Sequence, residues 1–227
     1  MTLSVIMPAY NEEGTIERAI QRVLAQALVA QLIVVDDGST DGTRASLASM
    51  QPHDPRMKVI VHSHNRGKGA AVRTALGHVN QPICIIQDAD LEYHPDDFVT
   101  VTSPIANGHC KVVYGSRVLH PENRYPLDWF RVGSFVVTHA ANVLYRTQLT
   151  DEPTGYKAFD TAFLKSLPLQ AQGFDFCPEV TAWVAKRGED IVEVPIRYAK
   201  RSVAEGKKIR WQDGLQALHV LVKLRFN

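Results

Sequence analysis

The sequence is poor in several features that define whole classes of protein. Its three cysteines, Cys84, Cys110 and Cys177, are too few and too far apart for a disulfide framework or a zinc cluster. No apolar run reaches the roughly 18 residues that a membrane-spanning helix needs. The N-terminus also lacks the basic and apolar regions of a signal peptide. These absences predict a cytoplasmic protein with reduced thiols and no segment that crosses a bilayer.

The charge balance excludes a further class of partner. Against 25 Lys and Arg residues stand 24 Asp and Glu residues, which gives a formal net charge of +1 over 227 residues. A nearly neutral chain has no overall attraction for nucleic acid, so we expect no nucleic-acid partner. Hydrophobic residues make up 45% of the chain, which is enough for one sizeable core. We therefore expect a single domain over residues 1–227.

Short apolar runs alternate with helical patterns in the first half of the chain. The patterns predict strands at 3–7, 32–35, 59–61 and 83–86, and helices at 16–27, 44–50 and 69–78. The first of these strands is expected to end at Pro8. The second half is less regular, with strands predicted at 111–114 and 191–196 and helices at 129–145 and 212–226. This order indicates an α/β fold with a mostly parallel central sheet and helices on both faces.

Acidic residues gather at the predicted carboxyl ends of the strands, where parallel sheets bind their ligands. Asp88 and Asp90 follow the fourth strand and are separated by one residue, so on an extended chain both carboxylates point to the same side. Glu92 continues this alternation. An isolated Asp-x-Asp is more often a solvated turn, but its place after the most hydrophobic strand favours a binding site. Three such oxygen donors are suited to Mg²⁺ or Mn²⁺, which would bridge and neutralise a departing diphosphate.

Two other loops carry chemistry that is less distinctive. Asp37 follows the second strand, where a carboxylate can accept hydrogen bonds from a base or ribose. Lys68 lies between glycines before a helix, a setting that suits phosphate, although the spacing is neither a P-loop nor a dinucleotide fingerprint. His62 and His64 have metal-like spacing, but no carboxylate or cysteine set accompanies them. We interpret the two histidines as ordinary residues at the end of a strand.

The motifs taken together resemble a known family. The chain contains, in this order, PAYNEE, VVDDGSTDGT, NRGKGAA and DADLEY. This set resembles the family 2 glycosyltransferases with the GT-A fold. Further along, GSR, TDEPTGYKAF, FDFCPEV, EVPIRYAKRS and EGKKI resemble the dolichyl-phosphate mannose synthase branch, whose members glycosylate polyprenyl phosphates. The resemblance implies a nucleotide-sugar-binding half over about 1–115 and an acceptor half over about 116–227 that ends in an amphipathic helix.

The resemblance also implies residues that bind the donor. The residues expected to line the nucleoside pocket are Pro8, Tyr10 and Glu12, with Asp37 on the base. The residues expected to contact the donor diphosphate are Asp88, Lys68, Arg201 and Lys208. The metal on this diphosphate is expected to be held by Asp88, Asp90 and Glu92, although the branch often has Gln where Glu92 stands.

On the acceptor side, the resemblance implies a basic site for the acceptor phosphate. Arg117 and Arg131 are expected to receive this phosphate, with Ser134 close by. The residues expected to act in catalysis are Asp88, Asp90, Arg117, Arg131 and Arg201. The implied reaction is an inverting displacement on a nucleoside diphosphate sugar, with GDP-mannose favoured and UDP-glucose next.

Two alternatives stay open at this point. A phosphate acceptor is already anionic near neutral pH and needs no general base, whereas a hydroxyl acceptor of a sugar or small molecule would need one. Asp151 and Glu152 are the candidates for that base, and their plainer interpretation is a turn before Pro153. A non-catalytic sugar-nucleotide-binding protein is the other alternative, and the intact Asp88 and Asp90 pair speaks against it.

A lipid acceptor would require contact with a membrane. Apolar residues recur at helical spacing within 129–139, where Arg131 interrupts them, and within 212–226, which carries Lys223 and Arg225 near its end. Such faces either pack in a core or lie in a membrane interface. Because one face coincides with an acceptor arginine, we expect peripheral contact with the inner face of the cytoplasmic membrane.

Overall fold

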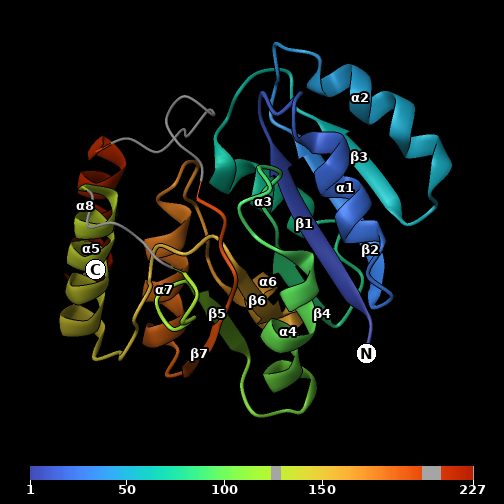
Figure 1. The fold of residues 1–227 in the computed structure, drawn as a ribbon. Coiled ribbons are helices and arrows are strands. Elements are labelled where there is room, and N and C mark those ends of the chain that lie inside the picture. The colour runs from blue at the N-terminus through green and yellow to red at the C-terminus, as the bar shows by residue number, and fades with distance from the viewer. Residues whose placement is uncertain (124–128, 201–210, 227) are drawn as a thin grey trace.

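The structure, a computed structural model, describes residues 1–123, 129–200 and 211–226. The strands in these ranges form a seven-stranded sheet in the order β3-β2-β1-β4-β6-β5-β7 (Figure 1). Neighbouring strands are parallel except where β6 pairs with β4 and with β5. Helices cover both faces, so the predicted α/β fold with a mostly parallel sheet is confirmed.

The sequence patterns located most of these elements. The strands are β1 (Leu3–Ala9), β2 (Val29–Asp36), β3 (Met57–Val61), β4 (Ile83–Ile86), β5 (Val112–Ser116), β6 (Lys157–Asp160) and β7 (Ile191–Pro195). The α-helices are α1 (Ile16–Leu24), α2 (Thr43–Met50), α3 (Lys68–Leu76), α4 (Phe98–Ala106), α5 (Trp129–Tyr145), α6 (Thr161–Ser166), α7 (Phe176–Lys186) and α8 (Trp211–Phe226). Two single 3₁₀ turns complete the set, η1 (Gln51–His53) and η2 (Pro95–Asp97). No prediction covered β6, α4, α6 or α7.

Several predicted boundaries were wrong by one to three residues. One of them is the end of β1, because this strand does not stop at Pro8. The strand continues to Ala9, and Pro8 pairs with Val35 of β2. On the other side of β1, the ladder with β4 ends at Ile6, which pairs with Ile86. A residue at position 8 would direct its N–H toward β4, but the β1–β4 ladder has already ended at Ile6. Pro8, which has no N–H, therefore interrupts no hydrogen bond between strands.

The alternation of β1 divides the core into two layers. Val5 and Met7 pack in a cluster with residues of α1, α2 and α4, whereas Ile6 packs in a cluster with residues of α3, α6 and α7. Successive side chains of a strand point to opposite faces, so one apolar run can serve both layers. The central strands are consequently buried on both sides.

Two helices form a third layer outside this core. Val137 and Ala141 of α5 pack against Ala217 and Leu221 of α8, and α8 also contacts α7. The hydroxyl of Tyr145 donates a hydrogen bond of 2.8 Å to the backbone oxygen of Leu221. Among the helices of the described ranges, none combines the length and the apolar character that crossing a bilayer requires.

The strand directions bring the chemically interesting loops to one edge of the sheet. The parallel strands all end at this edge, and the antiparallel strand β6 begins there. The loops after β1, β2, β3, β4, β5 and β7 therefore meet the segment that leads into β6. This convergence gathers residues from both halves of the chain (Figure 1).

The loop before α3 depends on a glycine with an unusual backbone. Gly67 has φ 93° and ψ 159°, a region that is essentially restricted to glycine. A Cβ at this position would lie 2.4 Å from the backbone oxygen of Gln172. Both the backbone angles and the close approach therefore exclude any other residue.

We predict that Gly67→Ala lowers the free energy of unfolding by at least about 1–3 kcal/mol, because the side chain meets both strain and a clash. Gly77→Ala is the matched control, since Gly77 has φ −61° and its Cβ would make an ordinary 3.5 Å contact. The control should be neutral or slightly stabilising. Urea denaturation of both variants measures the difference, and equal losses would contradict the argument.

Candidate active site

Hydrogen bonds from backbone N–H groups to side-chain hydroxyls connect the loop after β1 to the segment after β2. The backbone N–H of Asn11 donates to Ser39 Oγ at 3.0 Å, and that of Glu12 donates to Thr43 Oγ1 at 2.8 Å. Asn11 itself adopts a left-handed backbone with φ 50°. Glu12 is buried and Tyr10 is half-buried. Of the predicted nucleoside-pocket residues, Tyr10 and Glu12 thus lie on a loop held by hydrogen bonds at the carboxyl edge of the sheet, and Pro8 lies in β1.

Asp37 anchors a neighbouring loop in this structure. Its Oδ1 lies 2.6 Å from His62 Nδ1 and accepts a hydrogen bond from the N–H of Arg66 at 3.0 Å, while its Oδ2 accepts one from the N–H of Gly67 at 2.7 Å. The buried carboxylate therefore orders the chain that enters α3. Contact between Asp37 and a nucleotide base stays a prediction. His62 directly follows β3 and contacts Asp37, in agreement with its interpretation as an ordinary residue at a strand end.

A half-buried ion pair lies at the end of β4. Lys68 Nζ lies 2.6 Å from Asp88 Oδ1 and 2.8 Å from Asp88 Oδ2. Burial alone would lower the pKa of Lys68, but attraction to Asp88 outweighs burial and raises this pKa above its ordinary value. A Cβ on Gly155 would lie 2.6 Å from Asp88 Oδ2, so the segment before β6 closely backs the pair. Lys68 thus balances the charge of a predicted metal ligand.

The other two acidic residues of this loop have different surroundings. Asp90 Oδ1 accepts a hydrogen bond of 3.1 Å from the N–H of Glu92, across a turn in which Leu91 has φ 65°. Glu92 is buried, and its Oε2 accepts a hydrogen bond of 2.6 Å from the hydroxyl of Tyr198. The backbone N–H of Ala199 adds a hydrogen bond of 2.8 Å to the backbone oxygen of Glu92. The loop after β7 is therefore fastened to the acidic loop.

The fit of a divalent cation depends on these donors. Within residues 1–123, 129–200 and 211–226, no three His, Cys, Asp or Glu side chains are gathered closely enough to hold a metal ion. Asp88 and Asp90 carry the carboxylate oxygens that Mg²⁺ and Mn²⁺ prefer. Asp88 is paired with Lys68, and Glu92 accepts a hydrogen bond from Tyr198. The donor set fits a site of two carboxylates that a diphosphate completes.

On the acceptor side, Arg117 forms a buried ion pair. Its Nε and Nη2 contact the two carboxylate oxygens of Asp151 at 2.7 and 2.6 Å, and its backbone N–H donates to Asp151 Oδ2 at 2.9 Å. Its guanidinium also lies over the ring of Tyr198, 5.2 Å from the ring centre. Burial alone would raise the pKa of Asp151, but the charge and hydrogen bonds of Arg117 hold this pKa below its ordinary value.

Neither candidate general base is placed to accept a proton from a hydroxyl acceptor. Asp151 is 2% exposed and Glu152 is 0% exposed. Asp151 is paired with Arg117, and Glu152 Oε1 accepts a hydrogen bond of 2.9 Å from Thr181. Burial raises the pKa of Glu152, while its N–H donates to Thr138 Oγ1 at 3.1 Å. These contacts support a structural role for both carboxylates.

The remaining acceptor residues lie on α5. Arg131 is exposed and Ser134 is half-buried. Their spacing with Thr138 places all three on one face of the helix. Thr138 bonds to Glu152, which follows the partner of Arg117 in the chain, so this face is connected to the Arg117 pair. Two predicted donor residues, Arg201 and Lys208, lie outside the described residues.

Sequence reasoning missed an aromatic group beside the site. The ring of Tyr93 stacks on Tyr156 with centres 5.0 Å apart, and its hydroxyl accepts a hydrogen bond of 2.9 Å from the N–H of Gly155. Tyr198 packs against the other side at 5.3 Å. These tyrosines lie inside the motifs DADLEY, TGYK and IRYAK, so tyrosines next to charged motif residues were the available signal.

Comparison with known sequences points to a single family. The sequence profile described as "Glycosyl transferase family 2" matches residues 4–167. The UDP-N-acetylglucosamine--dolichyl-phosphate N-acetylglucosaminyltransferase of Methanococcus voltae is 30% identical, over 90% of this chain and 89% of that protein. The undecaprenyl-phosphate mannosyltransferase of Micrococcus luteus is 27% identical, over 91% of this chain and 87% of that protein. The dolichol-phosphate mannosyltransferase of Pyrococcus furiosus is 26% identical, over 91% of this chain and 59% of that protein.

Solved structures agree on the fold. Glucosyl-3-phosphoglycerate synthase from Mycobacterium tuberculosis, in complex with Mn²⁺, UDP and phosphoglyceric acid, matches with a TM-score of 0.74. The match covers 99% of this chain and 78% of that chain at 23% identity. The same enzyme in complex with Mg²⁺ and UDP matches with a TM-score of 0.72 at 24% identity, over 99% of this chain and 79% of that chain. At such identity the likeness establishes the shared fold alone.

We predict that Arg117→Met lowers the free energy of unfolding by about 3–5 kcal/mol, because Asp151 is left charged and buried without its partner. The double variant Arg117→Met/Asp151→Leu should recover much of this loss. Because the pKa of Asp151 is lowered, the pair stabilises the fold above the ordinary aspartate pKa and loses this effect as the pH falls. The free energy of unfolding in urea should therefore fall more steeply with decreasing pH in the parent than in the double variant. Parallel pH profiles would refute this role of the ion pair.

The Tyr198 contacts generate a second prediction. Tyr198→Phe should cost about 1.5–3 kcal/mol of unfolding free energy, because the hydrogen bond that the Tyr198 hydroxyl donates to the Glu92 carboxylate is lost. In a Glu92→Gln background the same change should cost clearly less. Tyr198→Leu should cost more than Tyr198→Phe, since the ring beneath Arg117 is also removed. Denaturation of the four cycle members measures this coupling, and strictly additive losses would show that the two side chains do not interact.

Proposed function

Because the chain belongs to glycosyl transferase family 2, we propose that it transfers a sugar from a nucleoside diphosphate sugar to a polyprenyl phosphate. The family membership makes it a glycosyltransferase with the GT-A type fold expected from its motifs. The observation that carries the proposal is the meeting of Asp88 and Asp90 with Arg117 at one edge of the sheet. Donor and acceptor chemistry therefore share one site.

The names of the relatives support this acceptor class. The relatives from Methanococcus voltae, Micrococcus luteus and Pyrococcus furiosus are named for dolichyl, undecaprenyl and dolichol phosphate respectively. The buried state of Asp151 and Glu152 gives no support to a hydroxyl acceptor, which would need a base. We propose GDP-mannose and UDP-glucose as donors, and the Methanococcus relative adds UDP-N-acetylglucosamine to the set that must be tested.

The described residues divide the work of such a transfer. Asp88 and Asp90 would hold Mg²⁺ or Mn²⁺, which when bound neutralises the charge of the leaving diphosphate. Lys68 holds Asp88 in place through their ion pair. Asp151 engages Nε and Nη2 of Arg117, and we assign the remaining Nη1 to the acceptor phosphate, together with Arg131 and Ser134. An anionic acceptor oriented in this way attacks without a general base.

The third layer supplies the membrane contact that a lipid acceptor requires. Trp129 at the start of α5 is 88% exposed, and Trp211 at the start of α8 is 74% exposed. Further large apolar side chains on the two helices are exposed, and they are Val132, Phe135, Val136, Val143, Leu215, Val222 and Phe226. We propose that these helices rest on the inner face of the cytoplasmic membrane.

A transfer assay tests the function directly. GDP-mannose, UDP-glucose and UDP-N-acetylglucosamine would be offered separately with Mn²⁺ or Mg²⁺, each with a short polyprenyl phosphate or with the alcohol of the same chain. We expect glycolipid from one donor, with the phosphate acceptor only, and none after a chelator removes the metal. Product from the alcohol alone would move the proposal to a hydroxyl acceptor, and no product from any pair would remove it.

Variants then separate the donor side from the acceptor side. Asp90→Ala should reduce turnover at least about 100-fold, because charge stabilisation of the leaving group is lost. Arg131→Ala should raise the KM for the acceptor about 10-fold or more, since one charge-assisted contact is lost. Arg18→Ala is the control, an exposed arginine on α1 that should leave both constants unchanged. Unchanged turnover in Asp90→Ala would refute the metal assignment.

A further inference from the structure

A basic pocket lies at the far end of the third layer, away from the acceptor residues. The cavity of about 260 Å³ is lined by Leu144, Tyr145, Arg146, Ala185, Lys186 and Arg225. Its three cations come from different elements, namely the residue after α5, the last residue of α7 and the end of α8. About 22 Å of helix separates Arg146 from Arg131. The pocket is therefore distinct from the proposed acceptor site.

Local charge neutralisation does not account for these cations. Helices α5, α7 and α8 all end here, and each C-terminus carries about half a negative charge. Three full positive charges exceed that sum, which leaves the pocket positive. Lys186 does donate a hydrogen bond of 2.9 Å to the backbone oxygen of Leu224. Within the described part of the chain, the guanidinium groups of Arg146 and Arg225 form no side-chain hydrogen bond or ion pair.

The backbone of Arg146 indicates that the arginine is there for a purpose other than stability. It follows the last turn of α5 with φ 57°, a left-handed conformation that favours glycine or asparagine at this position. A larger side chain here costs the fold some stability. Such strain collects at functional sites.

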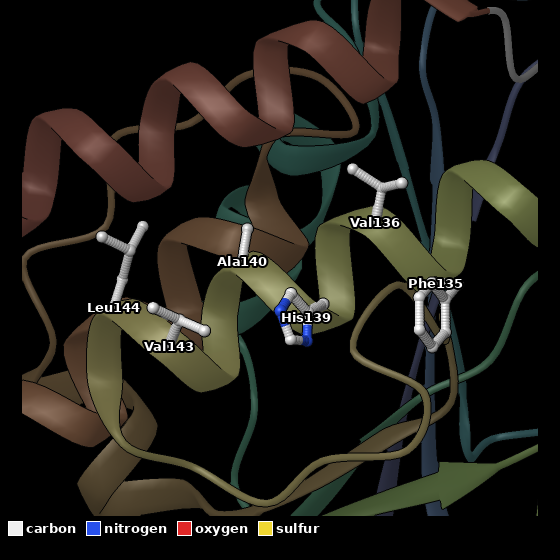
Figure 2. Close-up of a pocket in the computed structure, with 6 residues that line it drawn as sticks. All are labelled: Phe135, Val136, His139, Ala140, Val143 and Leu144. Atoms are coloured by element: carbon white, nitrogen blue, oxygen red, sulfur yellow. The ribbon is translucent and has the colours of Figure 1, made fainter.

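The pocket shares one lining residue with an apolar groove along α5. This groove, of about 460 Å³, is lined by Phe135, Val136, His139, Ala140, Val143 and Leu144, which follow one side of the helix (Figure 2). Leu144 lines both cavities. The surface thus changes from apolar to cationic along one helix, which matches the chemistry of an anionic amphiphile. Phe135 is 70% exposed and Val143 is 64% exposed.

We propose that the pocket of Arg146, Lys186 and Arg225 binds the phosphate headgroup of an acidic membrane phospholipid whose acyl region meets the α5 groove. The proposal rests on the proposed function, since a lipid acceptor brings this face to a bilayer. It adds a second anionic contact at the opposite end of α5 from Arg131. The helix would then be held to the membrane at both ends, which fixes its orientation as well as its depth.

Vesicle binding tests the site. The full chain would be sedimented with vesicles of phosphatidylcholine, with and without phosphatidylglycerol. We expect preferential binding to the acidic vesicles, weakened about 10- to 30-fold in Arg146→Gln/Arg225→Gln. The control Arg18→Gln/Arg22→Gln removes the same charge from exposed positions on α1 and should bind normally. Equal losses in both double variants would reduce the effect to overall charge, and unchanged binding in the pocket variant would overturn the proposal.

Arg146→Gly removes the ambiguity of a damaged fold. Because glycine relieves the left-handed backbone, this variant should melt about 2–4 °C higher than the parent. It should nevertheless bind acidic vesicles roughly fivefold more weakly, whereas Arg146→Lys should retain most of the affinity. A stabilised variant with parental vesicle affinity would show that the arginine has no lipid role.

Further experiments distinguish a phospholipid from other ligands of the pocket, and distinguish the lipid site from the proposed transferase function. Displacement from vesicles by millimolar inorganic phosphate would make this a site for a free anion, and a changed oligomeric state in the pocket variant would make it a contact between copies. Either result overturns the lipid assignment. Transfer to a short polyprenyl phosphate in detergent should be unaffected by Arg146→Gln/Arg225→Gln. Absent transfer with pocket-dependent vesicle binding would remove the proposed function and leave the lipid site standing.

Discussion

The buried ion pair between Arg117 and Asp151 is the interaction on which the acceptor edge depends. Neither charge can be left alone in such surroundings, so the loop after β5 and the segment before β6 must meet. The segment of Asp151 is fixed in turn by neighbours on three elements, because Glu193 of β7, Thr138 of α5 and Thr181 of α7 all hold residues 150–152. One pair therefore sets the position of β5, α5 and α7 relative to the sheet edge.

Tyr198 extends this constraint to the donor side. Its ring lies beneath the guanidinium of Arg117, and its hydroxyl donates to Glu92 in the acidic loop. An arginine assigned to the acceptor and a carboxylate beside the proposed metal ligands thus share one aromatic side chain. A shift of the chain at Tyr198 would be felt on both sides, and this residue leads into the segment of Arg201 and Lys208. The resemblance associates that segment with the donor phosphates, so Tyr198 would link the proposed donor and acceptor sites.

Sequence patterns predicted the elements that have a continuous apolar run or helical apolar spacing, and they missed elements in which a buried charge, a proline or β-branched residues obscure that pattern. The apolar runs of β1, β2 and β4 and the helical spacing of α5 were sufficient for their placement. Strand β6 was missed because its first residue is Lys157, whose ammonium is buried over the ring of Tyr114 and bonds to the backbone oxygen of Glu152. Helix α4 was missed because Pro104 and a run of β-branched residues do not favour a helix. The acidic motif was found, but partners far along the chain, such as Asp151 for Arg117, leave no local pattern.

The same limit applies to α5, for which periodicity could not decide between a core and a membrane. Val137 and Ala141 face α8, whereas Phe135 and Val143 face outward, so the helix is apolar on more than one side. An apolar side that stays exposed on such a helix indicates a surface of contact with a partner or a membrane. Arg131 near one end and Arg146 just past the other would lie at the level of lipid headgroups if that contact is with a bilayer. Core packing explains the inner side of α5, and the proposed membrane surface would account for both the exposed apolar side and the basic residues at its ends.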